Sequence, residues 1–102
     1  MASEAEKLGF HGVFQDDHIH SWGNMDACFE CYTTLAAVSA RTSKVRLGPL
    51  VTCAAYRNPS LVAKMSATLD VISNGRLEFG IGAGWHKEEY NGYGYPFENL
   101  AT

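Results

Sequence analysis

The chain has 102 residues, of which 46% are hydrophobic, and its formal net charge is −3. This length allows at most one small domain, and the acidic balance argues against binding nucleic acid or an anionic membrane surface. No apolar run is long enough to cross a membrane. Because the polar N-terminus lacks the apolar core of a signal peptide, the three cysteines indicate a reducing, cytoplasmic setting.

The first half of the chain predicts a helix, a strand and a second helix. Residues 3–9 form a helix that Gly9 ends, and Phe10–Phe14 is short, apolar and β-prone. Asp26 suits the N-cap of the next helix, which ends near Arg41-Thr42. The apolar positions of this helix follow three- and four-residue steps and are Cys28, Cys31, Tyr32, Leu35 and Val38.

The second half predicts a strand, a helix, a strand and the start of another helix. Val45–Thr52 is the first of these strands, and Arg76–Gly82 is the second. The helix between them begins at Asn58-Pro59 and ends at Asn74-Gly75, while Lys87–Asn91 begins the last helix. One face of the long helix is apolar and comprises Leu61, Val62, Met65, Leu69 and Ile72.

Strands that alternate with helices predict an α/β fold with parallel pairing and right-handed crossovers. A closed barrel of this type needs about 200 residues or more, and a parallel sheet of only these strands leaves edges and faces uncovered. We therefore expect residues 1–102 to be one partial α/β domain, which belongs to a larger barrel or associates with other chains. In such folds the loops after the strands carry the chemistry.

Asp17 and His18 directly follow the first predicted strand. A histidine there can exchange a proton near neutral pH, and a neighbouring carboxylate can orient it or bind a cofactor. A loop-capping aspartate beside a solvated histidine fits the residues equally well, so both interpretations stay open. His11, His20 and His86 are interpreted as structural or exposed.

Two further features belong to the predicted strands, one at a strand end and one inside a strand. Gly80-Ile-Gly-Ala-Gly84 allows a ligand to approach the backbone closely, but its spacing excludes a dinucleotide fingerprint, and a tight turn explains it equally well. Pro49 lies inside a predicted interior strand, which indicates a functional distortion or a simple bulge.

The cysteine pair Cys28 and Cys31 has C-x-x-C spacing. No second pair and no histidine at ligand spacing accompany it, so we expect core packing and no metal site. Several aromatic residues, including Trp22 and Trp85, could line a pocket for a flat ring or fill a core.

Short motifs in a fixed order resemble those of the bacterial luciferase-like superfamily, and most closely its deazaflavin (coenzyme F420) dependent oxidoreductases. The motifs are Tyr32-Thr-Thr-Leu-Ala-Ala37, Arg46-Leu-Gly48, Arg57-Asn-Pro59, Ala63-Lys64, Ala67-Thr-Leu-Asp70, Ser73-Asn-Gly-Arg76, Gly80-Ile-Gly-Ala-Gly-Trp85, Glu89-Tyr90 and Tyr93-Gly94. That family folds as a (β/α)8 barrel of about 300 residues. The resemblance implies that this chain is an N-terminal portion of such a barrel, with its second to fourth strands and the intervening helices.

The resemblance also implies roles at the cofactor. Asp17 matches a residue that touches the deazaflavin, and His18 matches the base that removes a hydroxyl proton from the substrate. Pro49-Leu50 aligns with a non-proline cis peptide bulge that backs the central ring, so Leu50 is a cofactor contact. Thr52 matches a residue that hydrogen-bonds the ring system, and Glu88 falls where a polar residue contacts the ring edge.

Two tryptophans match the substrate pocket of the family. Trp22 corresponds to a pocket tryptophan of the sugar-phosphate dehydrogenases. Trp85 stands where those enzymes carry a glutamate that donates a proton, which a tryptophan cannot do at neutral pH. The resemblance therefore implies a substrate other than a sugar phosphate.

The function implied by the resemblance is hydride transfer between coenzyme F420 and a small organic substrate, in an intact protein that forms a homodimer. Deazaflavin activates oxygen poorly, whereas with FMN the alternative is a luciferase-like monooxygenase. A third alternative is a non-catalytic barrel fragment. We expect the isolated 102 residues to be inactive and to bind cofactor weakly or not at all.

Overall fold

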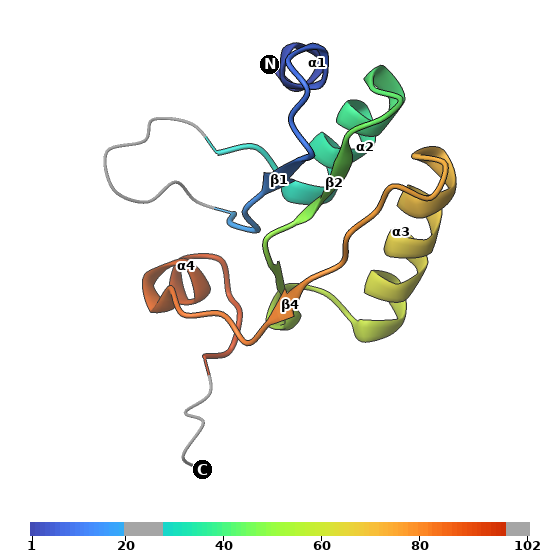
Figure 1. Cartoon of the computed structure of the whole chain (residues 1–102). Coiled ribbons are helices and arrows are strands. Elements are labelled where there is room, and N and C mark those ends of the chain that lie inside the picture. Colours follow the sequence, from blue (N-terminus) through green and yellow to red (C-terminus); the bar gives the residue numbers. More distant parts are fainter. Residues whose placement is uncertain (20–27, 98–102) are drawn as a thin grey trace.

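The computed structural model describes residues 1–19 and 28–97 (Figure 1). Its elements in chain order are α1 (Ala2–Lys7), β1 (Gly12–Gln15), α2 (Cys31–Arg41), β2 (Arg46–Pro49), β3 (Thr52–Cys53), the 3-10 turn η1 (Ala54–Tyr56), α3 (Pro59–Ile72), β4 (Ile81–Gly82) and α4 (Lys87–Gly92). The predicted alternation of strands and helices is confirmed. Within the described ranges, no helix has the length and apolar character that crossing a bilayer requires.

The strands pair in parallel, as predicted. β1 pairs with β2 so that Gln15 lies opposite Pro49, and β3 pairs with β4 so that Thr52 lies opposite Ile81. A single bridge between Leu47 and Leu77 joins β2 to the segment that leads into β4. The segment formed by β2 and β3 therefore runs between β1 on one side and residues 76–82 on the other.

The predicted strand Val45–Thr52 is interrupted, which corrects the sequence interpretation. The amide of Leu50 still donates to the Gln15 carbonyl (2.8 Å), whereas the amide of Thr52 donates to the Gly80 carbonyl (2.8 Å). The chain thus changes its pairing partner between these two residues, so one continuous strand cannot form. The predicted strand Arg76–Gly82 is likewise reduced to the bridge at Leu77 and the short β4.

Gly48 explains why the central segment lies so close to its neighbour. A Cβ atom at this position would overlap the carbonyl of Glu78. The approach lets the amide of Glu78 donate to the Leu47 carbonyl at 2.8 Å. A residue with any side chain at position 48 would therefore separate the two strands.

The start of α2 differs from the prediction. Glu30 is its N-cap, and the carboxylate accepts hydrogen bonds from the amides of Tyr32 and Thr33; the predicted cap, Asp26, lies outside the described residues. Cys28 was predicted to lie on the buried face of this helix, but it precedes the helix, so that prediction is wrong. Cys31, predicted on the same face, is fully buried. The end of the helix at Arg41 is as predicted.

The predicted ends of α3 are confirmed. The Asn58 side chain accepts from the amide of Ser60 at 2.8 Å, and Pro59 is the first helical residue. Asn74 and Gly75 both have positive φ angles, of 58° and 81°, that stop the helix.

The apolar face predicted for α3 is only partly buried. Val62 and Leu69 are buried, but Leu61 and Ile72 are 51% and 48% exposed. The face that touches the sheet is therefore narrower than the apolar stripe of the sequence.

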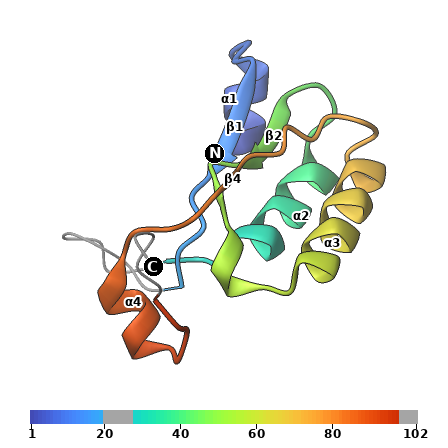
Figure 2. The same ribbon diagram turned by 90° about the horizontal axis from the view of Figure 1, so that it is seen from below.

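Helices α2 and α3 cover the same face of the strands (Figures 1 and 2). The core between these layers consists of Cys31, Tyr32, Leu35, Leu47 and Leu69. Several apolar strand-segment residues are not covered within the described chain: Phe14, Phe79 and Ile81 are 48%, 49% and 55% exposed. Burying them would require further chain or a partner.

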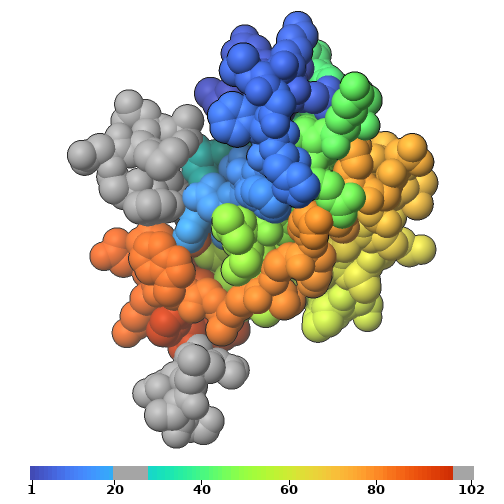
Figure 3. Space-filling model, in the orientation of Figure 1, coloured from blue at the N-terminus to red at the C-terminus, as the bar shows by residue number. Residues whose placement is uncertain are grey.

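A second cluster attaches α4 to the ends of the strands. Cys53, Tyr56 and Tyr90 are buried together, and Ile19 packs against them. Figure 3 shows the α4 segment, in orange, at the surface beside the light blue residues that follow β1. This packing brings the loops after β1, β3 and β4 together.

Candidate active site

A cavity of about 180 Å³ lies among the loops that follow the strands. Its walls are residues 16–18 after β1, residues 50–53 and Tyr56 around β3, and a set from Gly82 to Glu89 between β4 and α4. All three walls follow or form the carboxyl ends of parallel strands. This is the edge at which the α/β pattern predicts the functional residues.

The structure brings most of the predicted site residues to this cavity. Those that line it are Asp17, His18, Leu50, Thr52 and Trp85. Glu88 is exposed and does not line the cavity, whereas the next residue, Glu89, is buried and does. Trp22 lies outside the described residues.

The carboxylate of Asp17 is held by an arginine and a backbone amide. Its two oxygens accept from the Arg57 guanidinium at 2.6 and 2.9 Å, and one also accepts from the amide of Cys53 at 2.8 Å. The hydrogen bond with Asp17 raises the pKa of Arg57 despite its burial, so the guanidinium stays charged. A contact between Asp17 and a cofactor stays a prediction.

Arg57 also connects the cavity wall to α2. It donates to Glu30 at 2.6 Å and its guanidinium carbon lies 4.9 Å from the centre of the Tyr32 ring. The hydroxyl of Tyr32 is in turn 2.8 Å from that of Thr52. Thr52 therefore directs its hydroxyl to α2, and its predicted hydrogen bond to a ring system stays a prediction.

His18 is paired with a glutamate that sequence reasoning did not select. Its Nδ1 lies 3.0 Å from the Glu89 carboxylate, which is 1% exposed and also accepts from the amide of Ile19 at 2.7 Å. The hydroxyl of Tyr56 donates to the same carboxylate. Burial, with the hydrogen bond to Glu89, raises the pKa of Tyr56, so the phenol stays protonated and remains the donor.

Helical spacing gives a signal for this position, but not for its pairing with His18. In a helix that begins at Lys87, Glu89 shares a face with His86, three residues earlier, and Glu88 does not. The prediction placed the helix correctly but chose Glu88 from the resemblance alone.

Trp85 and His86 form an aromatic wall beside His18. The rings of Trp85 and His86 are stacked, with centroids 4.9 Å apart and an interplanar angle of 26°. Trp85 meets the His18 ring edge-on at 5.6 Å. His86, interpreted from the sequence as structural or exposed, therefore lines the site.

The predicted cis peptide is displaced by one residue. The bond between Leu50 and Val51 is cis, not the bond between Pro49 and Leu50. It lies where the central segment changes its pairing partner. The side chains of Leu50 and Val51, 64% and 40% exposed, form an apolar ledge at the cavity.

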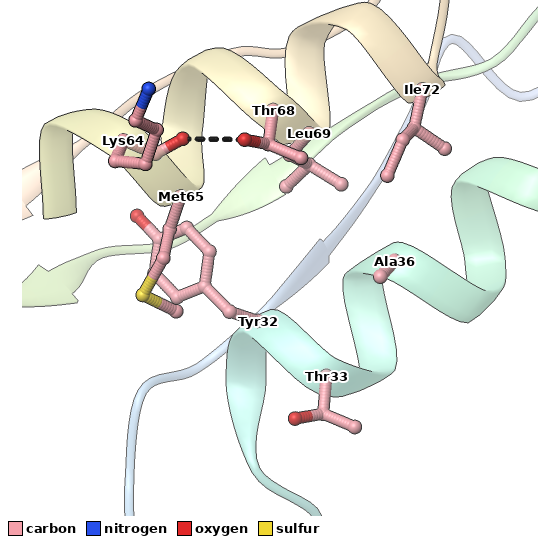
Figure 4. A pocket seen from close by; sticks show the side chains of 8 residues that line it. All are labelled: Tyr32, Thr33, Ala36, Lys64, Met65, Thr68, Leu69 and Ile72. Carbon is pink, nitrogen blue, oxygen red and sulfur yellow. Dashed lines mark hydrogen bonds between the residues drawn. The ribbon is translucent and has the colours of Figure 1, made fainter. Parts of the chain in front are cut away.

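A second hollow, of about 260 Å³, lies between α2 and α3 (Figure 4). Its lining includes Tyr32, Lys64, Met65, Leu69 and Ile72. Among the described residues, no acid, histidine or cysteine lines this hollow. Elsewhere in the described residues, no group of three or more histidine, cysteine or acidic residues is arranged to hold a metal ion.

The sequence profile of the family described as luciferase-like monooxygenase matches residues 1–101. The F420-dependent hydroxymycolic acid dehydrogenase of Mycobacterium tuberculosis is 38% identical over 81% of this chain and 24% of that protein. An F420-dependent glucose-6-phosphate dehydrogenase of Intrasporangium calvum is 41% identical over 78% of this chain and 25% of that protein.

Solved structures resemble the chain as well. An F420-dependent secondary alcohol dehydrogenase, in complex with an F420-acetone adduct, superposes with a TM-score of 0.86 at 32% identity, covering 98% of this chain and 31% of that one. Monooxygenase RslO1 of Streptomyces bottropensis gives 0.79 at 33% identity, covering 91% and 28%. The chain thus spans about a quarter of the length of the curated relatives, and it belongs to the luciferase-like monooxygenase family.

Proposed function

We propose that the whole protein is an F420-dependent oxidoreductase that transfers a hydride between the coenzyme and a small organic substrate. We also propose that residues 1–102 are the N-terminal part of its (β/α)8 barrel, since apolar residues such as Phe79 and Ile81 need further cover. The observation that carries the function is the pairing of His18 with buried Glu89 beside an apolar ledge at the strand ends. The F420-dependent relatives support the choice of cofactor.

The cavity fits a flat ring that is apolar on its face and polar at its edges. The ledge of Leu50 and Val51 offers an apolar surface, and a Cβ atom at Gly80 or Gly82 would crowd the Val51 side chain. Small residues therefore keep this wall open. We assign Leu50 to the ring face, and Asp17 and Thr52 to contacts with the ring system. Glu88 does not line this cavity, so its contact with a ring edge is assigned from the resemblance alone.

The chain's residues would supply binding, orientation and proton handling. Hydride donation or acceptance is the chemistry that a bound deazaflavin supplies. We assign His18 as the group that takes up or returns the substrate's hydroxyl proton. Trp85 is assigned to the substrate pocket, where its indole ring would exclude water. Trp22, which lies outside the described residues, is assigned to the same pocket from the resemblance alone.

The substrate class that suits the lining of this cavity is a small neutral alcohol or the corresponding carbonyl compound. No lysine or arginine lines the cavity within the described residues, whereas Asp16, Asp17 and Glu89 do. A phosphorylated sugar would meet these carboxylates and would not find a proton donor at Trp85. The similarity to a secondary alcohol dehydrogenase supports the same class.

The alternative is an FMN-dependent, luciferase-like monooxygenase; the similarity to monooxygenase RslO1 supports this reaction class. Titrating the whole protein with F420 and with FMN, followed by absorbance and fluorescence, separates the two because the cofactors differ in both. Tight binding of FMN and not F420 would favour the alternative. Binding of neither cofactor would favour a non-catalytic fragment.

We further propose a cytoplasmic homodimer, which sedimentation of the whole protein would test.

The function is tested by reducing F420 with a panel of small secondary alcohols. We expect His18→Ala to lower kcat by about 100-fold or more and to change F420 affinity by about threefold or less. His11→Ala, at an exposed histidine before β1, is the matched control and should retain turnover. Full turnover by His18→Ala would remove the proposed role.

A further inference from the structure

Glu89 is the most enclosed acidic side chain of the site, with 1% of its surface exposed. Its two oxygens receive three donors from different segments: the His18 ring, the amide of Ile19 and the hydroxyl of Tyr56. Because a backbone amide can only donate, and the Tyr56 phenol stays protonated, the carboxylate acts as an acceptor toward both. A buried carboxylate with this many donors is held in one orientation.

This arrangement determines which nitrogen of His18 carries hydrogen. The Glu89 oxygen near Nδ1 is an acceptor, so Nδ1 must donate. In neutral imidazole the other nitrogen, Nε2, is then the basic one. Ile19, whose amide donates to the second oxygen, directly follows His18, so Glu89 fixes both the ring and the backbone of the segment after β1.

We propose that Glu89 is a positioning residue for His18, which it holds in the Nδ1–H tautomer so that Nε2 accepts the substrate proton. The proposal rests on the proposed function and assigns a residue that is distinct from Glu88. In alcohol oxidation the hydroxyl O–H bond breaks and its proton passes to Nε2. The electron pair of the adjacent C–H bond leaves as hydride to the oxidised deazaflavin, and the carbonyl bond forms.

Glu89 has a second effect once the proton has moved. His18 then carries a positive charge, and the carboxylate 3.0 Å from Nδ1 stabilises it in a site shielded from water. Replacing Glu89 by glutamine keeps the size of the side chain but removes the charge. Its amide can donate as well as accept, so it no longer dictates the tautomer.

The tautomer is measured directly by long-range 1H–15N NMR of the whole protein labelled at its histidines, without cofactor. We expect the Nδ1–H form in the native protein and in Glu4→Gln, a control at an exposed glutamate of α1. Glu89→Gln should give a mixture of both tautomers. With F420 and an alcohol, it should lower kcat by about 10- to 100-fold while KM changes by about threefold or less.

The native protein provides a second test should Glu89→Gln fail to fold, because an Nε2–H form of His18 in the native protein would overturn the inference. Tyr56→Phe removes one donor but leaves the carboxylate facing Nδ1, so this variant should keep the Nδ1–H form. An unchanged Nδ1–H form in folded Glu89→Gln would likewise overturn the inference. A tautomer shift in a protein that never reduces F420 would support the positioning role and refute the proposed function, so the two can fail separately.

Discussion

The loop before α4 requires a glycine at position 84. Its φ angle is 87°, and a Cβ atom would overlap the hydroxyl of Tyr90 and crowd the sulfur of Cys53. We expect Gly84→Ala to lower the free energy of unfolding by about 1–3 kcal/mol, because it combines backbone strain with a steric clash. Thermal or chemical unfolding of the whole protein measures this.

Gly92, at the end of α4, is the matched control. Apart from its chain neighbours and the backbone of α4, no atom of the described residues lies within 4 Å of a Cβ added there, and its φ is not positive. Gly92→Ala should therefore leave stability within about 0.5 kcal/mol or increase it slightly. Equal destabilisation by both variants would show that the clash at Gly84 has been misjudged.

At the same scale, sequence reasoning selected Asp17 and His18 as candidates because both directly follow a strand. It did not select Glu89, because the contact with His18 spans 71 positions in the chain and arises only when α4 packs on the strand ends. The resemblance pointed to Glu88 instead. Short-range position can thus locate a candidate residue, whereas the partner that orients it depends on tertiary packing.

Among the elements, α2 depends on an ionised cap. Burial raises the pKa of Glu30, but hydrogen bonds from Thr33 and Arg57 outweigh it, so the pKa lies below the ordinary value of 4.5. A carboxyl group whose pKa is lowered by folding stabilises the fold at pH values above 4.5, its ordinary pKa. This stabilisation is lost as the pH falls through the folded-state pKa. Stability should therefore decline more steeply below about pH 4.5 in the native protein than in Glu30→Gln.

Chemical unfolding at several pH values checks this prediction. Glu4→Gln, at an exposed carboxylate in α1, is the control and should retain the native pH dependence. Parallel pH curves for the native protein and Glu30→Gln would contradict the role of the cap.

The carboxyl ends of α2 and α3 are joined by Arg76, which is 7% exposed. It donates to the carbonyls of Ser39 and Thr42 at the end of α2, each at 2.9 Å, and to that of Ser73 after α3 at 2.7 Å. Arg76→Met would leave these buried acceptors without their donor. We therefore expect the free energy of unfolding to fall by about 3 kcal/mol or more.

A second arginine offers the comparison for this prediction. Arg46 pairs with Glu78 near the surface, where both side chains are substantially exposed. Arg46→Met should therefore cost about 1 kcal/mol or less. Similar losses for the two variants in denaturant unfolding would disprove the special role of Arg76.

The helices were predicted better than the strands for a physical reason. The ends of α3 depend on neighbouring residues, such as Asn58 and Gly75, that local chemistry identifies. The break after Pro49 depends instead on the change of pairing partner from β1 to residue 80. Pro49 indicated a local distortion, but the change of pairing partner involves three segments at once and cannot be predicted from one of them.

For the whole molecule, the chain forms one edge of a site and not a complete enclosure. It spans about a quarter of its curated relatives, and apolar residues of its strand segments, such as Phe14 and Phe79, remain half exposed. The α/β class and the edge of the sheet at which the cavity lies followed from the alternation of strands and helices. The position of the cis peptide and the role of Arg57 required the paired strands and packed loops of the folded chain.

The central claim is that the ledge at residues 50 and 51 supports the face of the cofactor ring. Fluorescence titration of the whole protein with F420 tests it, using Leu50→Glu at the cavity and Leu61→Glu on the exposed side of α3, since both leucines are more than half exposed. We predict that Leu50→Glu weakens F420 binding by about tenfold or more, because the ring would meet a charge, and that Leu61→Glu binds like the native protein. Equal affinity of all three proteins would contradict the account.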